Sequence, residues 1–369
     1  MSNLALKYRP TRFSDVVGQV FLKRVLKSVI KKGEPYPNGF LFSGPRGIGK
    51  TTLARIFSAA VNCENPDDGE PCGSCDSCVS IREGKASSVV EIDAASHGLV
   101  DDVRKLTEIA CYTHSGKCRV IIFDEAHSAS DKAFNAFLKI LEEPPSSVVF
   151  ILATTEPDKI LKTVKSRLMP FDFRRITNAD ITKRLKFICE KEGIASNDGA
   201  LDEISQISEG GLRDSIVMLE QLVLFDGEVK LETVEEMFGV GRGRDYYNFL
   251  MSVKSGDYIK GIGVINKYFD CVGEGTLFIK GFISYFSDLL FHKLGVSRSV
   301  DENIDNMFTI DSIGDSVNIL WDVYKMSKDA YRMAAVILYI RFKRLLNPSE
   351  SMEEDVVDID SYLESCKGN

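Results

Sequence analysis

Gly44-Pro45-Arg46-Gly47-Ile48-Gly49-Lys50-Thr51 is the stretch of this chain that decides its fold. It fits the pattern G-x-x-x-x-G-K-[ST], and it lies between a short apolar run, Phe40-Leu-Phe42, and a helical pattern. Glycines in such a loop let successive backbone N–H groups turn inward around a phosphate, and the helix N-terminus adds positive potential. The sequence therefore predicts a strand, a phosphate-binding loop and a helix, in that order.

Each residue of the loop has an expected role. Lys50 is expected to reach the β- and γ-phosphates of a nucleoside triphosphate, and the Thr51 hydroxyl is expected to ligate Mg²⁺. The other residues expected to contact the nucleotide are Gly44, Pro45, Arg46, Gly47, Ile48, Gly49 and Thr52. The alternative is a glycine turn that matches by chance, and the order of strand, loop and helix argues against it.

A second stretch, Val120-Ile-Ile-Phe-Asp124-Glu125-Ala-His127, supplies carboxylates. Its apolar residues predict a buried strand that ends at the edge of a parallel sheet where ligands bind. We expect Asp124 to hold Mg²⁺, directly or through water, and Glu125 to polarise the attacking water as the general base. Taken alone, the stretch would be better explained as a strand ending in a solvated acidic turn, and the phosphate loop upstream reverses that preference.

The fold class follows from how short apolar runs alternate with helical patterns. Further runs that predict strands are Val89–Ile92, Val148–Leu152 and Met169–Phe173, and helical patterns cover Asp101–Tyr112 and Asp131–Glu142. Ser130 is the expected N-cap of the second of these helices. Short continuous apolar strands separated by helices predict an α/β domain with a parallel sheet covered on both faces.

Beyond about Arg175 the strand pattern ends and helical patterns continue. The expected helices are Ile181–Gly193, Asp198–Ser208 and Arg213–Phe225, followed by a glycine-rich break at 239–243 and helical periodicity over Val317–Leu346. We therefore expect three parts, which are the α/β domain at 1–175, a three-helix lid at 176–239 and an all-α domain with an acidic tail at 240–369.

The composition is that of an ordinary soluble globular protein. In 369 residues, 46 Lys plus Arg face 54 Asp plus Glu, 44% of residues are hydrophobic and 27% are charged. Collagen, low-complexity chains and membrane channels are thereby excluded. The N-terminus shows no signal peptide and the longest apolar stretches are too short for a membrane helix, so we expect a cytoplasmic protein without a membrane partner. The basic segment Lys162–Lys191 is interpreted as either a solvated face or a subunit interface.

Four cysteines cluster with the spacing C-x8-C-x2-C-x2-C, and these are Cys63, Cys72, Cys75 and Cys78. Four thiolates this close can surround one tetrahedral ion, so we expect a closed, structural Zn²⁺ site. The alternatives are an iron–sulfur cluster and free thiols. The other five cysteines are expected to be isolated core or surface thiols.

Further segments resemble a known family. With Leu152-Ala-Thr-Thr-Glu-Pro157 and Ser166-Arg167 following the acidic strand end, the chain resembles the AAA+ ATPases of the clamp-loader class. It is similar to the gamma/tau family of bacterial DNA polymerase III through Tyr8-Arg9-Pro10, Val16-Val-Gly-Gln19, Leu41-Phe-Ser-Gly-Pro-Arg-Gly47, Glu91-Ile-Asp-Ala-Ala-Ser96 and Leu141-Glu-Glu-Pro-Pro145. The resemblance covers Tyr8 to about Leu224 and weakens through the C-terminal third.

The resemblance implies that the chain binds and hydrolyses ATP with Mg²⁺. Arg9, Val17 and Gly18 would pack against the adenine. Thr154 or Thr155 would be sensor 1, near the γ-phosphate. The resemblance also implies that the cysteines at about 63–78 form an inserted zinc module.

Two arginines gain roles from the same resemblance. Arg213 would be sensor 2, reaching from the lid to the bound phosphate, and Arg167 would be an arginine finger that acts on the nucleotide of a neighbouring subunit. A guanidinium suits both roles, because charge spreads over the γ-phosphoryl oxygens. The family's usual finger motif is Ser-Arg-Cys, whereas this chain has Ser166-Arg167-Leu168.

The resemblance finally implies partners. They are the delta and delta-prime subunits, the sliding clamp, primer–template DNA and other copies of the chain in a pentameric ring joined by a C-terminal collar. The expected function is that of an ATP-driven clamp-loader subunit of the DNA polymerase III holoenzyme in DNA replication, without a polymerase active site of its own. A helix N-terminus after His97-Gly98 would face DNA, although Asp101 and Asp102 would repel phosphate. The alternatives are another AAA+ DNA motor, such as a branch-migration translocase, and a ring member that binds ATP without hydrolysing it.

Overall fold

The computed structural model describes residues 3–97, 103, 108–110, 116–145, 147–238, 243–269, 274–296, 302–325 and 331–346. Several expectations lie outside these residues. They are the Gly98 and Asp101–Asp102 segment, most of the glycine-rich break at 239–243, the acidic tail, and Cys111, Cys271 and Cys366. The chain divides into two compact units, Met1–Lys230 and Leu231–Asn369.

The first unit is built on a parallel sheet. Within the described residues its strands are β1 (Gly39–Ser43), β2 (Val89–Asp93), β3 (Arg119–Asp124), β4 (Val148–Thr154) and β5 (Met169–Asp172). Their order in the sheet is β2-β3-β4-β1-β5, and every pair is parallel. β1 pairs with β4 and β5, while β3 pairs with β2 and β4, so the carboxyl ends of all five strands meet at one edge of the sheet. All five predicted strands are confirmed, each within two residues of its expected ends.

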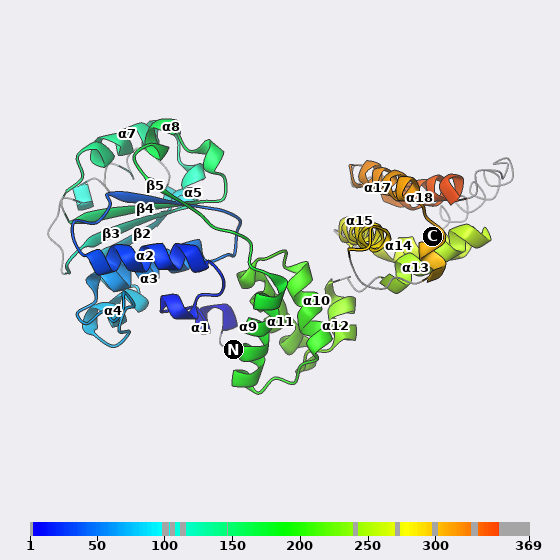
Figure 1. Ribbon diagram of the computed structural model, residues 1–369, viewed down its shortest axis with the longest axis horizontal. Helices are drawn as coiled ribbons and strands as arrows, with labels where there is room; N and C mark the ends of the chain where they lie inside the picture. The colour runs from blue at the N-terminus through cyan, green and yellow to red at the C-terminus, as the bar shows by residue number, and fades with distance from the viewer. Residues whose placement is uncertain are drawn as a thin grey trace. The chain divides into compact units, whose positions relative to one another are not determined.

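Side chains alternate along each central strand between two hydrophobic cores. Phe40 and Phe42 of β1 lie in the core beneath α2 (Val20–Lys32) and α3 (Lys50–Asn62), whereas Leu41 lies in the core beneath α7 (Asp131–Glu142). Figure 1 shows α2 and α3 on one face of the sheet and α7 with α8 (Lys162–Lys165) on the other. The sheet is therefore covered on both faces, which explains why its strands are continuous apolar runs.

The other elements of the first unit are short connections and a group of lid helices. Ser130 caps α7 as predicted, because its Oγ accepts the N–H of Ala133 at 3.2 Å. The short elements are α1 (Leu4–Lys7), η1 (Phe13–Asp15), α4 (Asp76–Arg82), α5 (Ala94–His97), η2 (Ala126–Ser128) and η3 (Pro157–Lys159). The lid helices are α9 (Asn178–Glu192), α10 (Asp198–Ile207) and α11 (Leu212–Asp226). Residues 103 and 108–110 are helical, as expected for that segment.

The N-terminal segment joins the lid to the sheet domain. The side chain of Arg184 in α9 donates to the backbone carbonyl of Tyr8 at 2.9 Å, and the Tyr8 hydroxyl bonds to the carboxylate of Glu192. Lys7 pairs with Glu192 at 2.6 Å, and α1 packs against α11. The lid is therefore held by the residues that precede the first strand.

The second unit is helical. Its helices are α12 (Leu231–Phe238), α13 (Gly243–Ser255), α14 (Tyr258–Phe269), α15 (Glu274–Lys293), α16 (Glu302–Asp305), α17 (Ile310–Tyr324) and α18 (Tyr331–Leu346). An aromatic cluster forms the centre of its core, in which Phe282 stacks on Phe342 with ring centroids 5.7 Å apart. The helical periodicity over 317–346 is divided between α17 and α18. No described helix of either unit is both long and apolar enough to cross a membrane.

The division into units differs from the expected domain boundaries. The lid and the sheet domain belong to one unit, and the second unit begins at Leu231 rather than at 240. Two backbone hydrogen bonds hold the end of the first unit to the lid. The N–H of Val229 donates to the carbonyl of Ala195 at 2.8 Å, and the N–H of Asn197 donates to the carbonyl of Val229 at 3.0 Å. Helix α12 is not one of the three expected lid helices. Its residues lie within the expected lid range of 176–239, and they fall in the second unit.

Candidate functional site

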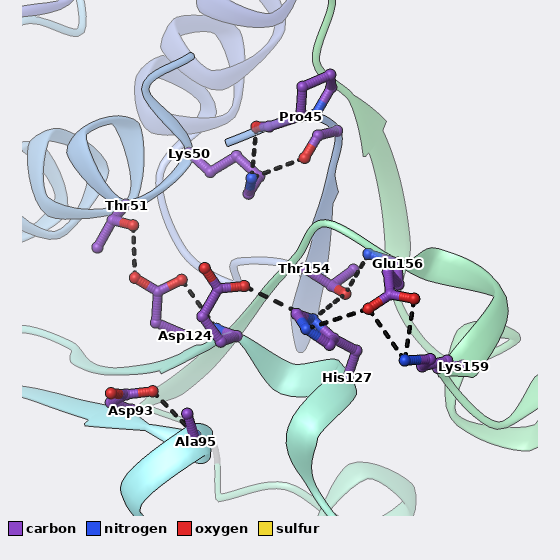
Figure 2. Close-up of polar contacts among 12 residues, drawn as sticks. Pro45, Lys50, Thr51, Asp93, Ala95, Asp124, His127, Thr154, Glu156 and Lys159 are labelled. Carbon is purple, nitrogen blue, oxygen red and sulfur yellow. Dashed lines mark hydrogen bonds and ion pairs between the residues drawn. The ribbon is translucent and has the colours of Figure 1, made fainter. Parts of the chain in front are cut away.

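The loop between β1 and α3 has the backbone that its glycines predict. Gly44 has φ +141°, and a Cβ there would lie 2.6 Å from the carbonyl oxygen of Phe173, so no other residue fits. Lys50 is the first residue of α3, and its Nζ donates to the carbonyls of Gly44 and Pro45 at 2.7 Å each (Figure 2). Burial lowers the pKa of Lys50, and the carboxylates of Glu125 and Asp124 act in the opposite direction.

The acidic end of β3 lies against this loop. The Thr51 hydroxyl donates to Asp124 Oδ2 at 2.6 Å, and Asp124 Oδ1 accepts the N–H of Glu125 at 3.0 Å (Figure 2). Glu125 has φ +47°, an unusual backbone for a residue other than glycine, and it turns the chain sharply from β3 into η2. The structure therefore brings together the hydroxyl and the two carboxylates expected at a Mg²⁺–triphosphate site, from segments 73 residues apart.

A cavity of about 530 Å³ opens beside these groups. The predicted site residues that line it are Arg9, Val17, Arg46, Gly47, Ile48, Gly49, Lys50, Thr51, Thr52, Asp124, Glu125 and Arg213. Gly18, Gly44, Pro45, Thr154, Thr155 and Arg167 are not among the lining residues. The Arg9 side chain donates to Thr52 Oγ1 at 3.3 Å, which places its guanidinium on the cavity wall.

The lid closes one side of the cavity. Arg213 lies in the first turn of α11, and its backbone N–H donates to the carbonyl of Gly47 at 3.3 Å. A Cβ at Gly47 would lie 3.3 Å from the carboxylate of Asp214, so the glycine allows the lid to approach the loop. Arg213 is therefore beside the phosphate loop, as expected for a residue that reaches the phosphates from the lid.

The two candidate sensor threonines differ in their surroundings. Thr154 at the end of β4 is fully buried, and its Oγ1 accepts the N–H of Glu156 at 3.0 Å and lies 3.2 Å from Nδ1 of His127. Thr155 is only partly buried. Of the two threonines, Thr154 is therefore the one with a polar contact to His127, which neighbours Glu125.

Arg167 lies at the end of α8, away from the cavity. Its guanidinium donates to Glu142 Oε1 and to the carbonyl of Thr163, each at 2.7 Å. Leu168, which replaces the family's cysteine, is buried in the core beneath α7. The departure from the family motif therefore affects local packing and leaves the arginine at the surface.

The four clustered cysteines come together in space. The Sγ atoms of Cys63, Cys72, Cys75 and Cys78 all lie within 4.8 Å of one another. Four sulfurs around one tetrahedral ion at the usual Zn–S distance are about 3.8 Å apart, so this arrangement fits a single ion. Sulfurs that bind different irons of a cluster would lie farther apart, which disfavours the iron–sulfur alternative. Cys118 and Cys189, which lie outside the cluster, are buried and free, as expected.

The thiols of the cluster have contrasting environments. The backbone N–H groups of Ser74 and Cys75 lower the pKa of Cys72 to about 6, and burial raises the pKa of Cys63 and Cys78. The N–H groups of Ser74 and Cys75 lie 3.5 and 3.3 Å from the Cys72 sulfur. Such N–H contacts stabilise a thiolate, the form that binds a metal.

The loop between Cys63 and Cys72 is attached to the N-terminal segment. Glu70 accepts the N–H groups of Phe13 and Ser14 at 2.7 and 3.0 Å, and it pairs with Lys27 at 3.1 Å. The Arg12 side chain donates to the carbonyl of Cys72 at 2.7 Å. The cysteine module therefore holds the segment that leads to Val16 and Val17 at the cavity.

Sequence reasoning missed several residues of the cavity wall. They are Asn3, Ala5, Leu6, Tyr8, Pro10, Val16, Glu91, Asp93, Ile176, Leu212, Ile216 and Val217. Asp93 could have been found, because it ends an apolar strand as Asp124 does and lies opposite Asp124 in the sheet. Glu91 lies in a segment that resembles the gamma/tau family, but nothing in the sequence predicts its bidentate pair with Arg55 at 2.6 and 2.7 Å.

Comparisons with known proteins agree with this geometry. Residues 18–177 match the family described as DNA polymerase III, delta subunit, and residues 183–224 match the RCF1/5-like AAA+ ATPase lid domain. The chain is 38% identical over 289 residues to the DNA polymerase III subunit tau of Bacillus subtilis, which covers 78% of this chain and 51% of the relative. The chain is homologous to DNA polymerase III gamma/tau subunits. The resemblance found in the sequence is thereby confirmed.

Other relatives and a solved structure extend the comparison. The DNA polymerase III subunit gamma/tau of Mycobacterium tuberculosis is 43% identical over 220 residues, which cover 59% of this chain and 38% of the relative. The Escherichia coli subunit tau is 40% identical over 238 residues, covering 64% of this chain and 37% of the relative. The chain thus spans about half or less of these relatives' lengths. The Thermotoga maritima RuvB Holliday junction branch migration motor is 16% identical, with a TM-score of 0.49 over 68% of this chain and 79% of that one.

The contacts of Glu70 predict that its side chain stabilises the fold. Replacing Glu70 with Ala leaves the backbone N–H groups of Phe13 and Ser14 without their acceptor and leaves Lys27 paired with Asp68 alone, so we expect the free energy of unfolding to fall by about 1–3 kcal/mol. Urea denaturation followed by circular dichroism measures this change. Glu64→Ala, at an exposed position in the same loop, is the matched control and should change stability by less than about 0.5 kcal/mol. Equal stability of the two variants would show that Glu70 does not hold the segment.

Proposed function

We propose that this chain is the ATP-hydrolysing subunit of a bacterial clamp loader. The observation that carries the proposal is the cavity in which Lys50, Thr51, Asp124, Glu125 and Arg213 meet, in a chain homologous to DNA polymerase III gamma/tau subunits. Backbone N–H groups at the start of α3 and the Lys50 ammonium would bind the β- and γ-phosphates. The reaction class is transfer of the γ-phosphoryl group to water, which needs positioning and charge stabilisation more than covalent chemistry.

Different residues of the cavity would hold the metal, orient the attacking water and receive the adenine. Thr51 and Asp124, already joined by a hydrogen bond, are the protein groups that would hold Mg²⁺, which neutralises phosphate charge when bound. Glu125 would orient the attacking water, and Thr154 would sense the γ-phosphate from the end of β4. The apolar wall at Val17, Ile216 and Val217, together with Arg9, would receive the adenine.

The proposal extends to the assembly. The helical second unit would form the collar of a ring that contains copies of this chain with delta and delta-prime subunits. ATP binding in that ring would allow it to open a sliding clamp, and primer–template DNA would trigger hydrolysis and release. The cysteine module would hold one structural Zn²⁺, because four sulfurs fill a tetrahedral shell.

The roles of Lys50 and Glu125 are tested together. Lys50→Ala should weaken ATP binding at least about 100-fold, because it removes the charged partner of the phosphates, whereas Glu125→Gln should keep binding and lower hydrolysis about 100-fold or more. Equilibrium binding of labelled ATP and steady-state phosphate release measure the two effects. Measurements with and without a sliding clamp and primed DNA separate a clamp loader from another DNA motor. Full turnover by the Glu125→Gln variant would refute the role given to this carboxylate.

The proposed finger is tested by comparing the assembled and isolated chain. Arg167→Ala should reduce ATP hydrolysis about 10³-fold in the assembly, because the guanidinium would stabilise charge on the neighbouring subunit's nucleotide. It should leave ATP binding by the isolated chain unchanged, since Arg167 does not line its own chain's cavity. Lys165→Ala is the control, because Lys165 lies two residues before Arg167 and its side chain pairs with Asp158 at 3.7 Å. An unchanged rate in the assembled Arg167→Ala complex would contradict the assignment.

The metal site predicts both composition and stability. The purified chain should contain one Zn²⁺ per molecule and no iron, and Cys72→Ser with Cys75→Ser should release the metal and lower the melting temperature. Elemental analysis and thermal denaturation check the two statements. Cys189→Ser, at a buried thiol outside the cluster, is the control that should retain the metal. Iron in place of zinc, or metal retained by the double variant, would refute the site.

A further inference from the structure

His127 lies between the carboxylate of Glu125 and the end of β4. It belongs to η2, directly after Glu125, and its side chain is only 16% exposed. Its Nδ1 lies 3.2 Å from Thr154 Oγ1 and 3.6 Å from Glu125 Oε2, while its Nε2 lies 3.5 Å from Glu156 Oε1 (Figure 2). One imidazole therefore faces the proposed water-orienting carboxylate, the proposed sensor hydroxyl and a second carboxylate, that of Glu156.

One oxygen of the Glu125 carboxylate lies against this ring. Among the described residues, Glu125 Oε2 is one of the buried side-chain oxygens without a hydrogen-bond partner. Its recorded polar contact is Nδ1 of His127, at a distance that is close for an ion pair and slightly long for a hydrogen bond. A buried carboxylate oxygen without a partner is costly, so a small approach to a protonated Nδ1 would stabilise the carboxylate in one orientation.

Thr154 competes with Glu125 for the same nitrogen. The Thr154 Oγ1 already accepts the N–H of Glu156 at 3.0 Å, and its hydroxyl has one proton to donate. If that proton points to Nδ1, the nitrogen presents a lone pair and cannot donate to Glu125. If the Thr154 hydroxyl instead donates to a phosphate oxygen, Nδ1 is free to take up a proton from solvent, and the imidazolium then donates to Glu125 through Nδ1 and to Glu156 through Nε2.

The outer side of the ring is also held. Nε2 faces Glu156, and Glu156 is paired with Lys159 at 3.0 Å (Figure 2). The contact between Nε2 and Glu156 limits rotation of the ring. The contacts at Nδ1 determine whether the ring bonds to Thr154 or to Glu125. The arrangement lets the hydroxyl at the end of β4 influence a carboxylate at the end of β3.

We propose that His127 is a positioning residue that couples the state of the Thr154 hydroxyl to the orientation of the Glu125 carboxylate. The proposal rests on the ATPase function proposed above and assigns the ring no contact with the nucleotide. Glu125 is oriented for the attacking water when a γ-phosphate engages Thr154, and it is released when Thr154 donates to the ring.

Three substitutions in the full chain, assembled with its partner subunits, test the coupling. In His127→Asn the amide nitrogen can take the place of Nδ1, so we expect kcat within about 3-fold of the unsubstituted assembly. His127→Gln and His127→Ala lose the group at Nδ1 and should lower kcat about 10- to 100-fold, as small misplacements of a reacting group do. The Kd for ATP should change less than about 3-fold in all three, because the ring does not line the cavity.

A substitution elsewhere in η2 controls for damage to the turn that carries His127. Ser128→Ala, an exposed position in the same η2 turn, should leave kcat and Kd unchanged and so report on the turn itself. Equal losses in the Asn and Gln variants, a normal rate in the Ala variant, or loss of ATP affinity in step with kcat would each overturn the coupling. An unsubstituted assembly that binds but never hydrolyses ATP would instead overturn the proposed function, and the coupling with it.

Discussion

The site depends on one constraint, the parallel pairing of β1 and β3 on either side of β4. Gly39 of β1 lies opposite Phe150 of β4, and Arg119 of β3 lies opposite Val148 of β4. Both β1 and β3 are therefore in register with β4. Their carboxyl ends must then meet at one edge, where Thr51 donates to Asp124 at 2.6 Å. Apolar residues that never contact a nucleotide fix this register, because a slip by one residue would exchange the two faces of the strand.

The N-terminal segment shows how a cavity is built from pieces that are distant in the sequence. Tyr8 is bonded to Arg184 and Glu192 of the lid, Arg9 reaches Thr52 of α3, and Phe13 is bonded to Glu70 of the cysteine module. Each contact spans more than forty residues of chain. The segment has little regular structure of its own, so its position is defined by partners on three sides.

Local pattern explains what the sequence could predict. Each feature that the sequence predicted depends on fewer than twenty consecutive residues. These features are the strands, the phosphate loop, the Ser130 cap and the cysteine cluster. The contact between Thr154 and His127 could not be predicted in this way, since it depends on which hydroxyl meets the imidazole across the sheet edge. The role proposed for His127 could not be predicted either, because a single histidine after two acidic residues is not a motif. Its contact with Thr154 exists only because β4 lies beside β3 in the sheet.

Helix α3 links the two chemical features of the first unit. Its first residues are Lys50 and Thr51 at the loop after β1, and Cys63 of the cysteine cluster follows directly after its last residue. The 13 residues between span about 20 Å, and most of them are buried. Glu70 connects the cysteine module mechanically to the cavity, because it holds Phe13 and Ser14, three residues before Val16 and Val17 in the cavity wall. The module thereby supports one wall of the cavity.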